Sequence, residues 1–116
     1  MDTPRPSDPI PIACDRGAFG AEERRRHEAL LHDLGGSVLE TRELEDGYAY
    51  RFAPVAGIVR DLAEWIGLEG ACCPFLRFSL DVEPNGGPVW LRLTGGPGVK
   101  QFIAGNLGPQ GRASTS

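Results

Sequence analysis

The chain has 116 residues, of which 41% are hydrophobic, so it can form one hydrophobic core but not two. Its formal net charge is -4, which argues against a nucleic-acid partner because phosphate binding needs an excess of Lys and Arg on one face. The only basic run, Arg24 to Arg26, is bordered by glutamates and indicates a solvated helix face with internal ion pairs.

The N-terminal residues lack the positive start and the apolar run of a secretory signal. No apolar segment approaches the roughly 20 residues that a membrane-spanning helix needs. We therefore expect a cytoplasmic protein with no membrane partner. In that compartment three cysteines indicate thiols for metal or redox chemistry rather than a disulfide framework.

The two ends of the chain differ in composition from its centre. Prolines recur through residues 1–12, which is typical of an extended segment, so we assign residues 1–13 to a flexible arm. Residues 108–116 are small and polar and predict a disordered tail. A single α+β domain is expected between them, over residues 14–107.

The first predicted element is a helix over residues 20–34, with glutamates in its first turn. Leu30, Leu31 and Leu34 form its apolar stripe. His27 lies on the inner edge of that stripe. We expect it to be a hydrogen-bonded histidine at the edge of the core rather than a metal ligand.

Two strands follow, over residues 37–44 and 48–53, joined through Asp46-Gly47, a pair that provides the positive φ of a tight hairpin. Aromatic residues occupy every second position of the second strand, so one of its faces is buried. A helix is then expected from about Val55 to Glu69.

The clearest half-buried strand covers residues 76–83, and a turn leads from it to a partner strand over residues 89–94. A glycine-rich turn then opens a last helix that ends near residue 107. The positions of the first of these strands that we expect to face inward are Leu76, Phe78, Leu80 and Val82.

The predicted order is α-β-β-α-β-β-α, an α+β fold with a four-stranded, mainly antiparallel sheet and helices on one face. A hairpin followed by a helix occurs twice, with Gly57-Ile58 matching Gly98-Val99. The match is too short to distinguish an internal repeat from two similar hairpins. The outer face of the sheet, which carries Trp90 among charged residues, is a candidate homodimer surface.

Cys72 and Cys73 stand side by side between the second helix and the strand that follows it, and chemistry is often located at such junctions. Glu69 falls on the same helical stripe as the apolar residues, so its carboxylate is predicted to point inward. A helix that ended near Leu68 would instead leave Glu69 in a solvated turn and both cysteines as small core residues. We favour a functional role, because packing alone does not require oxidisable thiols.

Cys14 closes the proline-rich arm, and the apolar residues around it would let it reach the pair formed by Cys72 and Cys73. A surface thiol on a flexible leader fits the sequence as well. Three thiolates would suit a soft ion such as Hg(II), Cu(I) or Zn(II), or As(III). Glu69 would then accept a thiol proton, orient a ligand, or donate a proton to a metal–carbon bond.

A motif around this junction carries a resemblance. Trp65-Ile66-x-Leu68-Glu69-x-x-Cys72-Cys73-Pro74-Phe75, with Gly47-Tyr48 before it and Trp90-Leu91-Arg92-Leu93-Thr94-Gly95 after it, resembles a group of small bacterial proteins over most of the chain. This resemblance implies no particular activity. Organomercurial lyases offer only an analogy of chemistry, since they also combine cysteine thiols with a carboxylate.

Three hypotheses follow. In the first, Cys72 and Cys73, aided by Cys14, bind a soft metal or metalloid for sequestration or detoxification, for example of mercury. In the second, Cys72, Cys73 and Glu69 are catalytic residues of an organometal lyase or a thiol-redox enzyme, although a helix C-terminus disfavours a thiolate. In the third, the chain is an interaction module whose cysteines only pack.

Overall fold

The structure is a computed structural model that describes residue 17 and residues 19–106. The predicted arm over residues 1–13, Cys14 and the predicted tail over residues 108–116 lie outside the described residues. The predicted order of elements is confirmed: α1 (Ala21–Gly36), β1 (Val38–Leu44), β2 (Gly47–Phe52), α2 (Ile58–Cys72), β3 (Arg77–Val82), β4 (Val89–Thr94) and α3 (Val99–Asn106).

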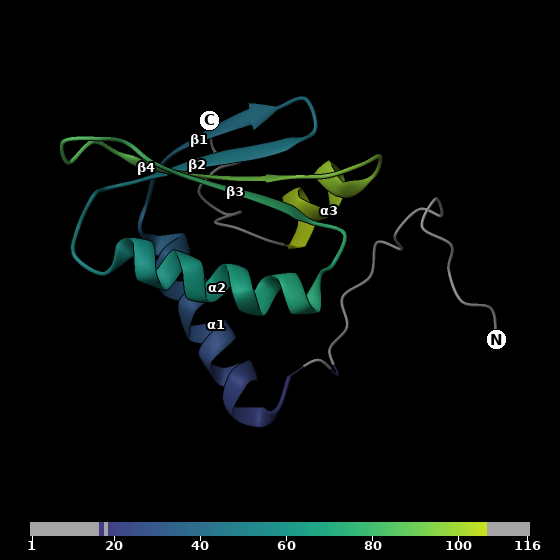
Figure 1. Ribbon diagram of the computed structural model, residues 1–116. Helices are drawn as coiled ribbons and strands as arrows, with labels where there is room; N and C mark the ends of the chain where they lie inside the picture. The colour runs from purple at the N-terminus through teal and green to yellow at the C-terminus, as the bar shows by residue number, and fades with distance from the viewer. Residues whose placement is uncertain (1–16, 18, 107–116) are drawn as a thin grey trace.

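The four strands form one antiparallel sheet in the order β1-β2-β4-β3. Every neighbouring pair is antiparallel, and Tyr50 of β2 lies opposite Leu91 of β4 at the centre of the sheet. Figure 1 shows the three helices on the same side of the sheet, with α1 beyond α2. The predicted α+β architecture is therefore confirmed.

In both hairpin–helix units the helix begins in the same way. Gly57 and Gly98, which directly precede α2 and α3, both have a positive φ, of 85° and 89°. This left-handed conformation favours glycine because a Cβ atom would be strained there. The residues that follow, Ile58 and Val99, are both buried. The sequence match thus corresponds to one local geometry used at two helix starts.

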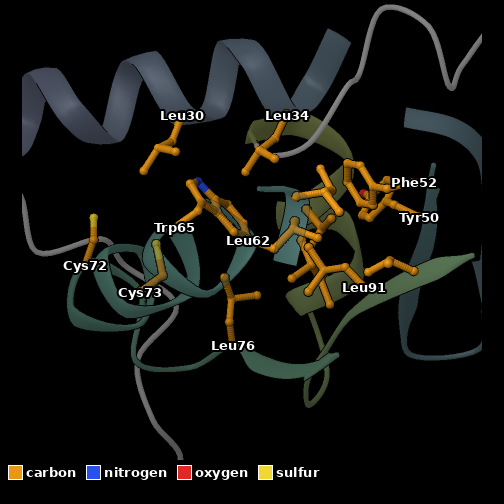
Figure 2. Packing of buried hydrophobic residues seen from close by; sticks show 14 of the residues in the cluster. Leu30, Leu34, Tyr50, Phe52, Leu62, Trp65, Cys72, Cys73, Leu76 and Leu91 are labelled. Atoms are coloured by element: carbon orange, nitrogen blue, oxygen red, sulfur yellow. The ribbon is translucent and has the colours of Figure 1, made fainter. Parts of the chain in front are cut away.

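The core lies between the inner face of the sheet and the helices. Leu62 of α2 and Ile103 of α3 are fully buried against Leu91 and Leu93 of β4. Figure 2 shows Leu30 and Leu34 extending from α1 toward Trp65 and Leu62 of α2, so α1 closes the second side of α2. The edge of Phe78 meets the face of Trp65, with 5.9 Å between the ring centroids.

Three local predictions were wrong. Val82 was expected to face inward but is 57% exposed, because it lies at the end of the edge strand β3, beyond the cover of the helices. The second helix begins at Ile58 and continues to Cys72, three residues later at each end than predicted. Gly47 does not have the positive φ expected of the turn.

Gly47 is instead required by the close approach of two strands. It lies opposite Thr94 in the pairing of β2 with β4. A Cβ atom at this position would come within 1.9 Å of the carbonyl oxygen of Leu93. Since the backbone of a central strand cannot yield by that distance without breaking the ladder, no larger residue fits.

The outer face of the sheet is covered by paired charges. The guanidinium group of Arg42 stacks over Trp90, 4.6 Å from its ring centroid. Arg42 and Arg51 both donate hydrogen bonds to Glu40, whose pKa they hold below its usual range. Ala49 lies between Arg42 of β1 and Arg92 of β4 in the strand register and is buried.

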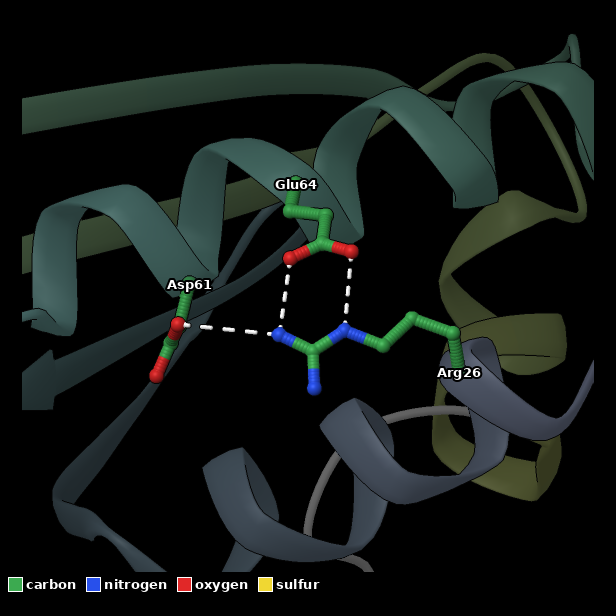
Figure 3. Close-up of polar contacts among 3 residues, drawn as sticks. All are labelled: Arg26, Asp61 and Glu64. Atoms are coloured by element: carbon green, nitrogen blue, oxygen red, sulfur yellow. Dashed lines mark hydrogen bonds and ion pairs between the residues drawn. The ribbon is translucent and has the colours of Figure 1, made fainter. Parts of the chain in front are cut away.

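A charged contact sets how α1 lies on α2. Arg26 of α1 donates two hydrogen bonds, each 2.8 Å long, to the two carboxylate oxygens of Glu64 on α2. Figure 3 shows this fork-to-fork pairing, with Asp61 near the same Nη2 atom of Arg26 that also pairs with Glu64. The hydrogen bond from Arg26 holds the pKa of Glu64 below its usual range.

This contact gives a pH dependence with a defined sign. Because the pKa of Glu64 is lower in the folded than in the unfolded chain, its contribution to stability is present above the unfolded pKa and is lost as pH falls through the folded pKa. We expect Arg26→Gln to lower the free energy of unfolding slightly at pH 7, and the difference from wild type to shrink below about pH 4.5.

Urea denaturation followed by circular dichroism between pH 3 and pH 7 measures this difference. Arg25→Gln is the matched control, because the ion pair that Arg25 makes within the described residues is with the exposed Glu22 on its own helix. If the difference in free energy of unfolding between Arg26→Gln and wild type stays constant over the whole pH range, the pH dependence does not come from the pair of Arg26 and Glu64.

Candidate functional site

The inward-facing carboxylate predicted for Glu69 is present. Glu69 lies on the buried stripe of α2 with Leu62, Trp65 and Cys72, and only 1% of its surface is exposed. The alternative of a solvated turn is wrong, because α2 continues for another turn beyond Leu68. The hydrogen bond from the N–H of Cys73 to the carbonyl oxygen of Glu69, 2.6 Å long, closes that turn.

His27 of α1 is the partner of this carboxylate. Its Nε2 atom lies 2.5 Å from Oε1 of Glu69, and only 15% of its side chain is exposed. A nitrogen and an oxygen so close must share a hydrogen, so one of the two groups donates it. The prediction of a hydrogen-bonded histidine at the core edge is confirmed.

Two aromatic rings pack against the imidazole of His27. Trp65 is stacked on His27 with an interplanar angle of 17° and 6.4 Å between the ring centroids. Phe19, just before α1, contacts His27 with 5.2 Å between the centroids. Because these rings limit rotation of the imidazole, its Nε2 atom stays directed at Glu69.

Two buried polar atoms of this cluster have no hydrogen-bond partner among the described residues. They are Oε2, the second carboxylate oxygen of Glu69, and Nε1 of Trp65. One is an acceptor and the other is a donor. Buried polar groups are nearly always hydrogen-bonded, so these two atoms, one helical turn apart, are the polar atoms of the cluster that a further group could contact.

The two thiols lie at the end of the same helix. Cys72 is the last residue of α2 and Cys73 is its C-cap; both are buried, and Cys73 is completely so. In Figure 2 both sulfur atoms point to the side of the helix where α1 and Trp65 lie. Glu69, Cys72 and Cys73 thus all lie on the last turn of α2 and its C-cap, whereas Cys14 lies outside the described residues.

We name the cluster of Glu69, His27, Trp65, Cys72 and Cys73 the thiol–carboxylate site. Within residues 17 and 19–106, no group of three or more His, Cys, Asp or Glu residues is placed to hold a metal ion. No helix in the described part of the chain is long and apolar enough to span a bilayer. Comparisons with protein-family models, curated proteins and solved structures find no match to this chain.

Sequence reasoning missed that His27 pairs with Glu69. The signal was present in two places: a histidine on the inner edge of one helix and an inward carboxylate on another. Combining them requires knowing that α1 packs on α2 in this register. The indole N–H of Trp65 was also missed, because an apolar stripe accounts for a tryptophan without reference to its nitrogen.

The pair of His27 and Glu69 gives a second prediction. His27→Ala removes the hydrogen-bond partner that the buried carboxylate of Glu69 has among the described residues, so we expect the free energy of unfolding to fall by about 3 kcal/mol at pH 7. Glu69→Leu replaces the carboxylate by an apolar side chain of similar size. Adding it to His27→Ala should recover part of the loss, because no buried charge then remains.

A double-mutant cycle measured by urea denaturation tests this coupling. His32→Ala is the matched control, since His32 lies on the exposed side of α1. If the effects of His27→Ala and Glu69→Leu simply add, the two side chains are not energetically coupled.

Proposed function

We propose that the protein binds a soft metal ion or metalloid through the thiols of Cys72 and Cys73, as a sequestration or detoxification protein. The observation that carries the proposal is the buried carboxylate of Glu69, paired with His27 on one oxygen and without a described partner on the other, one turn before two buried thiols. Sulfur ligands select soft ions and metalloids over hard cations.

Because of where the thiols lie, binding of a cation to them includes transfer of their protons. Both thiols are buried at the C-terminal end of α2. A cation that binds sulfur must displace the thiol protons. We propose that Glu69, which is hydrogen-bonded to His27 one turn before the thiols, receives a proton.

Cys14 is proposed as a third ligand. It precedes the described domain on a segment with apolar residues at 10, 12 and 13. A third sulfur would complete a trigonal set around a soft ion. The proposal for Cys72 and Cys73 does not depend on it.

The second candidate function is enzymatic, and the unsatisfied oxygen of Glu69 favours it. If that oxygen carries a proton, it can protonate the carbon atom of an organomercurial whose mercury is held by the thiols. The carbon–mercury bond breaks, the new carbon–hydrogen bond takes the proton, and mercury stays on sulfur. Glu69 would then recover its proton from solvent through His27.

Titration of the reduced protein distinguishes binding from packing. We expect Hg(II), As(III) or Cu(I) to bind more tightly than Zn(II), and Cys72→Ser or Cys73→Ser to weaken binding at least about 100-fold by removing a sulfur ligand. Isothermal titration with a competing thiol measures it. Cys14→Ser, which keeps both buried thiols, is the matched comparison. Micromolar or weaker binding that neither buried substitution changes would end the proposal.

The enzymatic candidate has its own test. Glu69→Gln keeps the size of the side chain but cannot serve as the acid, so turnover of methylmercury to methane should fall by about 100-fold or more while Hg(II) binding is retained. Gas chromatography of the headspace measures the methane. Equal methane release by wild type and Glu69→Gln would exclude Glu69 as the proton donor.

A further inference from the structure

The sheet ends on one side in β3, a strand that has a neighbour on only one of its edges. Glu83, directly after β3, donates a backbone hydrogen bond of 3.2 Å to the carbonyl oxygen of Pro88, directly before β4. Alternate residues of an antiparallel strand bond to the same neighbour, and the register of β3 on β4 is regular along the whole strand. The backbone N–H and C=O groups of Phe78, Leu80 and Val82 therefore point away from β4, at the free edge.

The side chains along this edge differ between the two faces of the sheet. Phe78 and Leu80 face the helices and are half-buried, and Val82 continues this apolar row with 57% of its surface exposed. Arg77 and Glu83 lie at opposite ends of the strand, on the outer face, and both are exposed. Within the described part of the chain neither has an ion-pair partner. The edge thus combines free backbone groups, an apolar row and unlike charges at its two ends.

We propose that β3 is an interaction surface for a second copy of this chain, whose own β3 adds to the edge in antiparallel orientation to make one continuous sheet. The two-fold axis passes beside Leu80, which faces the partner's Leu80. On the side of the helices, Phe78 faces the partner's Val82. On the outer side, Arg77 faces the partner's Glu83. This inference is independent of the proposed function, because it uses no residue of the thiol–carboxylate site.

The pleat of the strand and its free backbone groups select this register. Residues that face each other across two paired strands lie on the same face of the sheet, so the axis must pass beside a residue and not between two. With the axis at Leu80, the outward-pointing residues exchange hydrogen bonds with their counterparts, and the partner's Phe78 covers Val82. With the axis at Ser79, Val82 would instead face the partner's Leu76, which precedes the strand and is already buried.

The two end charges select the antiparallel orientation. Opposite charges that face each other across neighbouring strands are stabilising, and like charges are destabilising. A two-fold contact uses the same surface of both chains, so the pair of Arg77 and Glu83 occurs twice in the dimer. A parallel arrangement in the same register would place each of these residues beside its own copy.

The other edge of the sheet is less suited to a partner strand. The register of β1 on β2 shifts between Val38 and Glu40, and such a bulge disturbs the backbone groups that a new strand would need. The positions of β1 on the side of the helices include Thr41 and Glu43, which are polar, and Lys100 of α3 donates a hydrogen bond to Glu43. An apolar row comparable to that of β3 is therefore missing from β1.

Charge reversal at the two ends of β3 tests both the orientation and the register. Arg77→Glu and Glu83→Arg each place like charges across the contact twice per dimer, so each should weaken self-association about tenfold. An equimolar mixture of the two variants, and also the double variant, again places opposite charges together and should restore the dimer. Sedimentation velocity over a concentration series measures the association. Arg25→Glu, which changes the net charge as much as Arg77→Glu but lies on α1, is the matched control.

Amide hydrogen exchange in wild type examines the same contact without a substitution. The N–H groups of Phe78, Leu80 and Val82 should exchange more slowly as the protein concentration rises, because the partner strand accepts their hydrogen bonds. The N–H groups of Ser79 and Asp81 face β4 and should change less. Residue-resolved exchange measured by nuclear magnetic resonance distinguishes the two sets.

Each result decides the inference. A wild type that stays monomeric at every concentration would overturn it, and so would dimers that both charge reversals leave equally stable. Dimers that Trp90→Ala weakens while the charge reversals do not would assign self-association to the outer face of the sheet. Exchange at the even-numbered positions of β3 that does not depend on concentration would contradict the pairing as well. Metal titration of the same samples reports on the thiols separately.

Discussion

The contact between His27 and Glu69 is the constraint on which the arrangement of this molecule depends. A carboxylate that is 1% exposed needs a partner, and the one it has among the described residues comes from a different helix. Leu30 and Leu34 supply the apolar packing between α1 and α2, and Arg26 adds an exposed ion pair to Glu64. Together these contacts place the imidazole beside the carboxylate at the end of α2.

The length of α2 decides where the chemistry is located. The two hairpin–helix units have equivalent starts, at Gly57 and Gly98, and Leu62 and Ile103 occupy similar fully buried positions. Glu69 and Cys72 lie on the turns of α2 beyond Trp65. These turns are outside the part of α2 whose packing resembles that of α3. The thiol–carboxylate site is therefore an addition to the scaffold of one unit, completed by α1, which precedes both.

Polar atoms left without partners in a buried cluster cost free energy, commonly about 1–3 kcal/mol each. Oε2 of Glu69 and Nε1 of Trp65 are two such atoms, on successive turns of one helix and next to two thiols. An apolar pair of side chains would have packed at lower cost. Their presence is the physical reason why the proposed function is placed at this cluster, whose Trp65, Cys72 and Cys73 also belong to the hydrophobic core.

The sequence by itself determined the order of elements, the sheet and the inward direction of Glu69, because hydrophobic period, turn residues and helical spacing are local properties. It could not determine that α2 runs to Cys72, since helical pattern alone does not mark the end of a helix that enters a buried junction. Nor could it pair His27 with Glu69 or show that Trp65 keeps an unsatisfied N–H. Those facts depend on how α1 packs against α2, which joins residues 42 positions apart, and only the tertiary structure decides contacts at that separation.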